Sequence, residues 1–277
     1  MNRQWTGKAW QTLFLPRLST KEVEELDKGK GAVVLPVGAV EQHGDHLPIY
    51  TDTLIAEGVV TEAFEHLSLQ DNVWLLPPLP FGKSTEHQNH PGTVTLTSET
   101  LQNVVMDIAE SIQRSGFRRL VLFNAHGGNS DLLNMMAREI RIKTGLMVFR
   151  ANAMDGRPEI EHNLSEKEKR YGIHGGDVET SLVLALEEEW VNMTCASNEC
   201  YSPFFENEVR IDIKGGPSVA WIADDVSESG TSGCAGEASK ERGETFLSVL
   251  GEYFAKTLQV IAAFEMKALK GTMSQTK

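Results

Sequence analysis

The chain has few cysteines and no long apolar run. Its 277 residues include three cysteines, Cys195, Cys200 and Cys234, and none of them forms a C-x-x-C pair. This number and spacing argue against a disulfide framework and are typical of a protein kept in a reducing cytoplasm. No segment approaches the roughly 18 to 20 apolar residues that span a bilayer, and residues 1–16 lack the apolar core of a signal peptide. We therefore expect a soluble, cytoplasmic protein with no membrane partner.

Basic residues are also in deficit. The 26 Lys and Arg residues stand against 39 Asp and Glu residues, which gives a formal net charge of −13 at pH 7. Nucleic acids and anionic lipids are polyanions themselves, so this balance opposes binding to either of them. It does not oppose an anionic small molecule, because a single local Arg or Lys could bind one.

Apolar segments alternate with amphipathic ones along the chain. Strands are predicted over residues 31–40, 73–80, 119–125 and 146–151, and helices over residues 97–115, 129–144, 177–188 and 241–266. Near-continuous apolar strands between amphipathic helices are typical of a mainly parallel sheet covered on both faces. The sequence thus predicts an α/β fold with one domain over residues 1–277. The polar segments 155–171 and 224–236 are expected to be surface loops that could cover a site.

In parallel sheets, ligands bind at the edge where strands end and helices begin. The segment Glu41-Gln-His43-Gly-Asp45-His46 directly follows the first predicted strand. In an extended chain Glu41 and His43 point to the same side, and Asp52 could return after a short turn. Zn²⁺, Mn²⁺ and Fe²⁺ accept both carboxylate and imidazole ligands. For this segment alone, a solvated loop rich in histidine and acid is the alternative.

A second polar segment follows the third predicted strand. Asn124-Ala-His126-Gly-Gly-Asn129-Ser130 places His126 at the mouth of the sheet, in a turn whose two glycines allow a close approach to a ligand. A histidine in such a turn is often only a turn residue. His-Gly-Gly loops also build the oxyanion hole of serine esterases, but those enzymes need a G-x-S-x-G elbow, which this sequence lacks.

The segment His174-Gly-Gly-Asp177-Val-Glu179 opens a predicted helix. Asp177 is expected as its N-cap, and Glu179 falls in the first turn, where the helix dipole favours a negative charge. Simple helix capping would explain this segment alone. Glu179 gains interest as a carboxylate that could join the other two segments.

A fourth segment, Ser84–Thr93, follows the second predicted strand. It carries Glu86, His87 and His90, which could support the same edge or belong to a plain polar loop. Taken together, four segments that converge on one edge with five or more candidate ligands indicate a metal site.

The order of these motifs resembles that of the creatininase (creatinine amidohydrolase) family. The matching motifs are VGAVEQHGDHLP followed by TD, then STEH with HPGT, then NAHGGNS, and finally HGGDVETS. They lie between Val34 and Leu186. The resemblance implies a three-layer α/β/α hydrolase that binds two divalent metal ions per chain, Zn²⁺, Mn²⁺ or Fe²⁺. It also implies a homo-oligomer, usually a hexamer.

Carried over residue by residue, the resemblance implies that Glu41, His43, Asp52 and His126 are metal ligands, with Asp52 as the bridging carboxylate. Creatininase supplies a further glutamate two residues after the histidine that matches His126.

Gly128 stands in the place of that glutamate. In this respect the chain is similar to an HGGN branch of the family, in which the glutamate of the ETS motif, here Glu179, takes the ligand role. That branch includes deformylases of riboflavin and deazaflavin precursor synthesis and the mycofactocin peptide-cleaving enzyme.

The expected reaction is hydrolysis of an amide, lactam or formamide C–N bond in a small molecule by a metal-activated water. His46, Glu86 and His174 are the candidates to protonate the leaving nitrogen. A metal-dependent lyase or isomerase is one rival hypothesis, and a non-catalytic metal-binding subunit is the other.

Overall fold

The computed structural model describes residues 6–201, 210–214 and 217–269. Its sheet has the strand order β2-β1-β3-β4, and all pairings are parallel. The strands are β1 (Ala32–Val37), β2 (Val73–Leu75), β3 (Arg119–Asn124) and β4 (Met147–Asn152). Val37 pairs with Asn124, and Asn124 pairs with Asn152. Three strands therefore end at the same level, which brings the segments after them to one edge.

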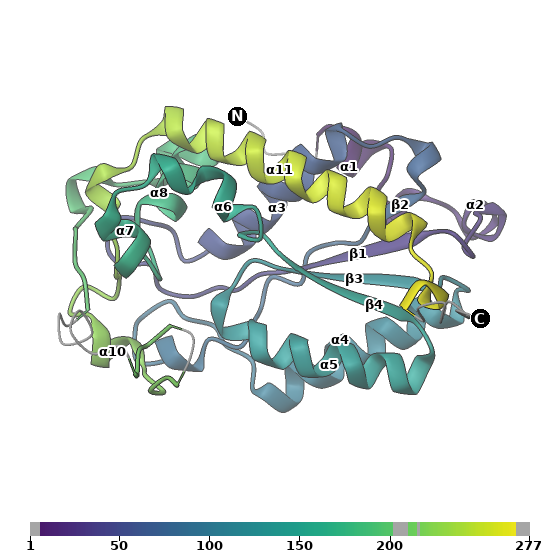
Figure 1. Ribbon diagram of the computed structural model, residues 1–277, viewed down its shortest axis with the longest axis horizontal. Coiled ribbons are helices and arrows are strands. Elements are labelled where there is room, and N and C mark those ends of the chain that lie inside the picture. The colour runs from purple at the N-terminus through teal and green to yellow at the C-terminus, as the bar shows by residue number, and fades with distance from the viewer. Residues whose placement is uncertain (1–5, 202–209, 215–216, 270–277) are drawn as a thin grey trace, which may run out of the picture.

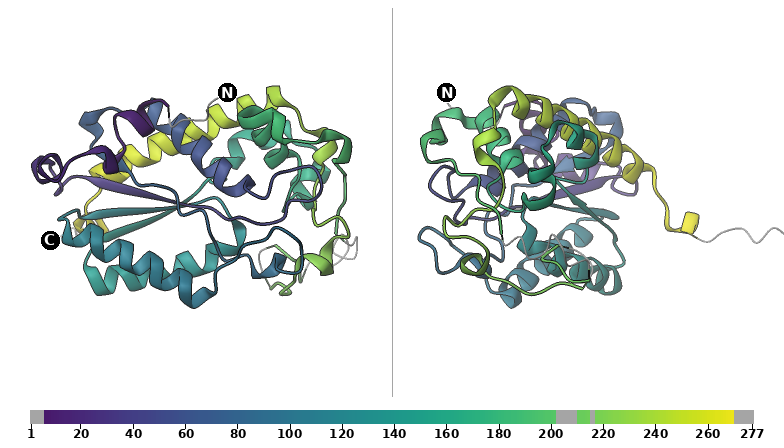
Figure 2. Two further views of the ribbon diagram at one scale, coloured as in Figure 1. Left: turned by 180° about the vertical axis from the view of Figure 1, so that it is seen from behind. Right: turned by 60° about the vertical axis from the view of Figure 1, so that its left-hand side comes forward.

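Helices cover both faces of this sheet (Figure 1). One face packs against α1 (Lys8–Gln11), α3 (Thr51–Glu65), α8 (Asp177–Glu187) and α11 (Lys240–Ala263). The other face packs against α4 (Ser98–Arg114) and α5 (Ser130–Thr144), and the view from behind shows the same two layers (Figure 2). Val34 and Leu35 illustrate the division, since their side chains enter the cores on opposite faces. The three-layer α/β/α fold with a parallel sheet is thus confirmed.

The remaining helical segments are short. They are α2 (Thr20–Glu25), α6 (Arg157–Ile160), α7 (Glu166–Tyr171) and α10 (Ala223–Val226). Single 3-10 turns lie at Leu15–Arg17, Leu69–Asp71, Thr85–His87, Gly127–Asn129, Glu161–Asn163, Glu188–Trp190, Met193–Cys195, Ala235–Glu237 and Met266–Leu269.

Amphipathic helices begin and end close to their predicted limits. In α4 the Thr97 side chain accepts a hydrogen bond from the backbone N–H of Thr100, and α5 ends at Gly145, whose φ of 76° a glycine adopts without strain. Helix α3 was not predicted. Most of its residues are buried on every side, so it lacks the one-sided apolar stripe by which a surface helix is recognised.

Two predicted surface loops are more ordered than expected. Segment 155–171 contains α6 and α7 and buries Glu168, so its description as a loop is wrong. Within segment 224–236, residues 230–235 are buried, and Ser232 forms an antiparallel β-bridge with His174. This segment therefore packs directly against the polar edge of the sheet.

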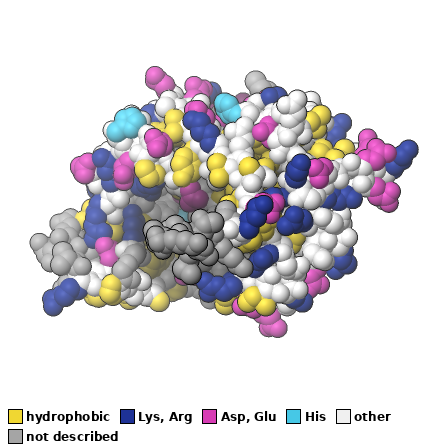
Figure 3. Space-filling view, turned by 45° about the vertical axis from the view of Figure 1, so that its right-hand side comes forward, with side chains coloured by type: hydrophobic (Ala, Val, Ile, Leu, Met, Phe, Trp, Pro, Cys, Tyr) yellow, Lys and Arg dark blue, Asp and Glu magenta, His cyan; other side chains and the backbone are white. Residues whose placement is uncertain are grey.

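The surface carries acidic and basic side chains interspersed over the face drawn in Figure 3. Among the described residues, no helix combines the length and apolar character that crossing a membrane requires.

Candidate metal centre

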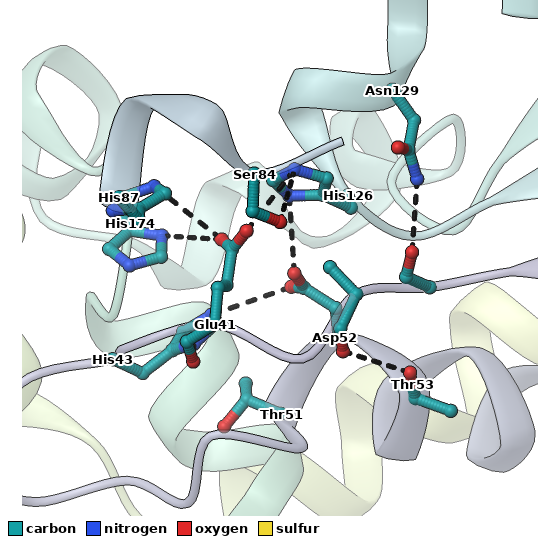
Figure 4. Close-up of polar contacts among 12 residues, drawn as sticks. Glu41, His43, Thr51, Asp52, Thr53, Ser84, His87, His126, Asn129 and His174 are labelled. Carbon is teal, nitrogen blue, oxygen red and sulfur yellow. Dashed lines mark hydrogen bonds and ion pairs between the residues drawn. The ribbon is translucent and has the colours of Figure 1, made fainter. Parts of the chain in front are cut away.

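Five side chains from four segments meet at the carboxyl edge of the sheet, and Figure 4 labels four of them, Glu41, His43, Asp52 and His126. Glu41 and His43 follow β1, Asp52 lies in the first turn of α3, His126 follows β3, and Glu179 lies in the first turn of α8. The first four are almost fully buried. The structure thus brings together all five residues that the resemblance proposed as metal ligands.

Glu41, Asp52 and His126 form a first group, whose ligand atoms all lie within 4.8 Å of one another. His126 lies between the two carboxylates, with Nε2 3.2 Å from Glu41 Oε2 and Nδ1 3.2 Å from Asp52 Oδ2. Two carboxylates and one imidazole are a donor set that borderline divalent cations accept.

His43, His174 and Glu179 form a second group of the same size. His43 Nε2 lies 3.9 Å from Glu179 Oε2 and 3.4 Å from Asp52 Oδ1. Asp52 therefore directs one oxygen toward each group, as a bridging carboxylate would. Asp52 can do so because the first turn of α3 places it between the strand-end segments.

The central atoms of both groups are buried without hydrogen-bond partners among the described residues. These atoms are the two carboxylate oxygens of Glu41, Nε2 of His43 and Oδ2 of Asp52. Buried polar atoms are almost always hydrogen-bonded, because an unpaired one costs free energy, and a carboxylate costs most. Atoms that converge in this way fit divalent cations, which would compensate the negative charge.

The pKa values show how strongly these groups interact. Burial acts to lower the pKa of His43, but the carboxylates of Asp52, Glu179 and Glu41 outweigh it and raise that pKa to about 9. Burial raises the pKa of Glu179 to about 7, with further repulsion from Asp52 and Glu41. The field of the site therefore favours positive charge at its centre.

A hydrogen bond from one ring nitrogen to a backbone carbonyl orients each histidine. His43 Nδ1 lies 3.0 Å from the carbonyl oxygen of Glu41, and His126 Nε2 lies 3.0 Å from that of Lys83. Carbonyl oxygens only accept, so each of these nitrogens carries a proton, and the opposite nitrogen is the one that a cation would bind with release of its proton. His43 thereby presents Nε2, and His126 presents Nδ1.

Gln42 fixes two further histidines behind Glu41. Its Nε2 donates to Nδ1 of His87 at 2.8 Å and to the carbonyl oxygen of Gly230 at 2.7 Å, which uses both of its protons. His87 then carries its proton on Nε2, which faces Glu41 Oε1 at 3.5 Å. His174 Nε2 donates to the carbonyl oxygen of Gln42 at 2.7 Å, so its Nδ1 is unprotonated.

The three predicted proton donors lie in different surroundings. His174 is one of the residues that line a cavity of about 350 Å³. His46 is buried, its Nε2 lies 2.9 Å from Thr180 Oγ1, and burial together with His43 lowers its pKa to about 4. Glu86 pairs with Lys83 at 2.9 Å, and its Oε1 lies 3.7 Å from His126 Nε2. Neither His46 nor Glu86 lines the cavity.

The cavity adjoins the metal-binding groups, since His126, His174 and Glu179 belong to its wall. Its volume lies in the lower part of the range for small-molecule sites. The rest of the wall comes from the segments after β3 and β4 and from α7, and includes Arg157 and Glu168.

Sequence reasoning missed Gln42 and Arg157. Gln42 stands between Glu41 and His43, where an extended chain would point it away from them. Its role depends on Gly230, a contact 188 residues away along the chain. Arg157 lies in the segment expected to be a surface loop.

Asp177 was predicted to be the N-cap of α8, and this is wrong. Gly176 is the N-cap, and the buried Asp177 side chain instead pairs with Arg242 and Ser181.

Comparisons with known proteins identify the family of this chain. The family model "Creatininase: Creatinine amidohydrolase" matches residues 16–258. A creatinine amidohydrolase of Pseudomonas putida is 30% identical over 267 residues, which cover 90% of this chain and 97% of the relative. A mycofactocin precursor peptide peptidase of Mycobacterium ulcerans is 31% identical over 182 residues, 64% of this chain and 67% of the relative.

A solved structure described as "Creatininase Mn" superimposes with a TM-score of 0.70 at 28% identity, over 89% of this chain and 97% of that one. The family match spans the sheet, both helical layers and every segment of the candidate metal centre. The chain belongs to the creatininase family.

Proposed function

We propose that this protein is a metal-dependent amidohydrolase, which cleaves a C–N amide, lactam or formamide bond of a small molecule with water. The observation that carries the proposal is the pair of neighbouring ligand groups, with Asp52 directed toward both, which bury unpaired polar atoms and border a cavity. Membership of a family named for an amidohydrolase supports the same reaction class. The bond cleaved is expected to be a non-peptide C–N bond, as in creatinine amidohydrolase.

Two divalent cations are assigned to the site. Glu41, Asp52 and His126 would hold one of them. His43 and Glu179 of the second group would hold the other, together with the Asp52 oxygen that faces His43. When bound, Zn²⁺, Mn²⁺ or Fe²⁺ would polarise the amide carbonyl and lower the pKa of an attacking water.

His174 is the best placed of the three candidates to carry a proton to the leaving nitrogen. Its Nε2 proton is committed to the Gln42 carbonyl, so Nδ1 can accept a proton and release it. Burial and the neighbouring His43 and His87 lower its pKa well below the usual value, so the ring is neutral at rest and would release a proton readily once it has taken one up. His46 lacks contact with the cavity, and Glu86 is paired with Lys83.

Supporting residues keep these groups in place. His87 directs its Nε2 proton toward Glu41, and Gln42 holds both His87 and the Gly230 segment. Partners of this kind orient the ligands of a metal, and their loss typically costs about 10- to 100-fold in metal affinity.

The proposed assembly is a homo-oligomer, a hexamer by family resemblance, and the proposed location is the cytoplasm, where free thiols such as Cys195 stay reduced. Analytical ultracentrifugation of the purified full-length chain tests the assembly.

Turnover in H₂¹⁸O tests the reaction. Metal-loaded protein is incubated with a panel of formamides, lactams and small ureido compounds, and the products are analysed by mass spectrometry. We expect metal-dependent cleavage that places one ¹⁸O atom in the new carboxyl or carbamate group. Turnover without ¹⁸O would favour a lyase or isomerase, and a loaded protein that turns over no compound would favour a non-catalytic metal-binding subunit.

A further inference from the structure

Arg157 lines the same cavity as His126, His174 and Glu179. It is the first residue of α6, directly after the turn that follows β4. Its backbone N–H donates to the carbonyl oxygen of Met154 at 3.0 Å, and Pro158 follows it in the first turn. The preceding Gly156 packs so closely on α11 that an added Cβ would lie 3.1 Å from Leu250 and Tyr253. The position of Arg157 in the cavity wall is therefore fixed by the fold.

The guanidinium of Arg157 forms few polar contacts with the described part of the chain. Its side chain's hydrogen bond within the described ranges is a long one, from Nη2 to the carbonyl oxygen of Glu168 at 3.5 Å. Across those same ranges it forms no ion pair with a carboxylate within 4.0 Å. A guanidinium has five N–H donors, so most of its donors remain available to a ligand.

Three carboxylates of the cavity wall accept hydrogen bonds from groups other than Arg157. Glu168 Oε2 accepts from the backbone N–H of Cys234 at 2.7 Å, and Glu179 Oε2 accepts from that of Gly175 at 2.6 Å. Asp155 accepts from the backbone N–H and the side-chain Nδ2 of Asn152 at 2.8 Å and 3.0 Å. Within the described ranges none of the three forms an ion pair with Arg157 within 4.0 Å, and the charge of Arg157 acts to lower the pKa of Glu168.

A second cation lies behind this part of the wall. Lys214 Nζ donates to the carbonyl oxygen of Gly172, a cavity-lining residue, at 3.1 Å. Burial, with a contribution from the positive charge of Arg157, lowers the pKa of Lys214 to about 8. The nearby Arg170 differs, because Asp212 pairs with it at 2.5 Å. Arg157 and Lys214 therefore bring two positive charges to this part of the wall, beside the carboxylates of Asp155 and Glu168, in a chain whose net charge is −13.

We propose that Arg157 binds an anionic group of the substrate, a carboxylate or a phosphate, so that the preferred substrates are amides of acidic small molecules. The inference rests on the proposed function, because the amide must lie at the metal centre while its anionic group reaches Arg157. The guanidinium suits this task, since its planar donors match the oxygens of both anions.

Hydroxamates that bind divalent metals test this inference without turnover. Isothermal titration of Mn²⁺-loaded protein compares acetohydroxamate, the singly charged succinic monohydroxamate and its neutral terminal amide. We expect the charged compound to bind roughly tenfold more tightly than its neutral amide, the effect of a charge-assisted hydrogen bond. A phosphonate analogue distinguishes a phosphate site from a carboxylate site by which anion gains more.

Three variants locate the effect. Arg157→Gln should abolish the preference for the charged compound and leave the affinity for acetohydroxamate unchanged, whereas Arg157→Lys should retain part of the preference. Arg150→Gln removes an exposed charge of β4 and should retain all of it. Equal binding of the charged and neutral compounds by the wild type, or a preference that survives in Arg157→Gln, would overturn the inference. If acetohydroxamate showed no metal-dependent binding, the proposed function itself would fail, and the inference with it.

Discussion

The carboxylate of Glu86 fills the space in which a side chain on Gly128 would begin. An added Cβ at position 128 would overlap Glu86 Oε1, and it would lie 2.5 Å from His126 Nε2 and 2.6 Å from the carbonyl oxygen of Lys83. The family resemblance implies that creatininase has a glutamate at the position that Gly128 occupies in this chain. Here a carboxylate from the Thr85–His87 turn occupies the space instead, so the glycine and the glutamate depend on each other.

Gly128→Ala should therefore disturb the metal centre although alanine is small. Real Cβ atoms essentially never approach another heavy atom within 3.0 Å, and the Lys83 carbonyl is backbone that cannot rotate away. We expect a loss of about 1–3 kcal/mol in the free energy of unfolding, the usual cost of overpacking, and weaker metal binding through displacement of His126. Urea unfolding and metal titration measure the two effects.

Gly127→Ala is the matched control. A Cβ at position 127 would have nothing within 4 Å, so we expect both quantities to stay close to wild type. If the two alanine variants behaved alike, the proposed dependence of Gly128 on Glu86 would be refuted.

The sequence predicts the fold well because its strands are apolar and several of its helices are amphipathic. The limits of α4 and α5 follow from an apolar stripe and from Thr97 and Gly145. Helix α3 was missed for a physical reason, since burial on all sides removes the periodicity that identifies a helix.

For the site, the motifs identify which residue types gather, but not their individual contacts. Nothing in the local pattern distinguishes His174, which lines the cavity, from His46, which packs against Thr180. Gln42 and Arg157 owe their positions to contacts with segments far away in sequence, which a local reading does not contain.

Glu179→Gln should remove one metal ion rather than both. Glu179 faces His43 in the second group, whereas the first group of Glu41, Asp52 and His126 does not include it. Titration of metal-free protein with Mn²⁺ should therefore show about one binding event per chain instead of about two. Glu189→Gln, at an exposed position, serves as the control. Unchanged stoichiometry in Glu179→Gln would argue against its assignment as a ligand.

Glu168→Gln should change how stability depends on pH. Burial raises the pKa of Glu168 above its usual value of 4.5, so the folded state binds its proton more tightly than the unfolded state does. The free energy of unfolding then falls as pH rises from 4.5 through the raised pKa. Gln stays neutral and can still accept from the backbone N–H of Cys234. In urea unfolding of EDTA-treated proteins, the free energy of unfolding of the variant should rise relative to that of the wild type as pH rises across this window. A difference between the two that does not change with pH would contradict the account.

Arg242→Ala should destabilise the packing of α11 against α8. Arg242 Nη2 lies 2.5 Å from Asp177 Oδ2, and the Asp177 side chain is fully buried. Removal of the guanidinium leaves a buried carboxylate without its cation, and because Arg242 is partly exposed we expect a loss of about 2–3 kcal/mol. Lys240→Ala breaks the exposed pair with Glu188 and should cost less than about 1 kcal/mol. Thermal unfolding compares the two, and equal losses would contradict the prediction.

Metal content tests the central claim most directly. The protein is purified without added metal, one portion is incubated with Mn²⁺ or Zn²⁺ and desalted, and inductively coupled plasma mass spectrometry counts the ions per chain, with Glu41→Ala and His126→Ala treated in parallel. The account predicts about two divalent ions per wild-type chain, and a clear loss in both variants. Wild-type protein that holds less than about a tenth of an equivalent before and after incubation would contradict it, since groups built as ligands would then bind no metal.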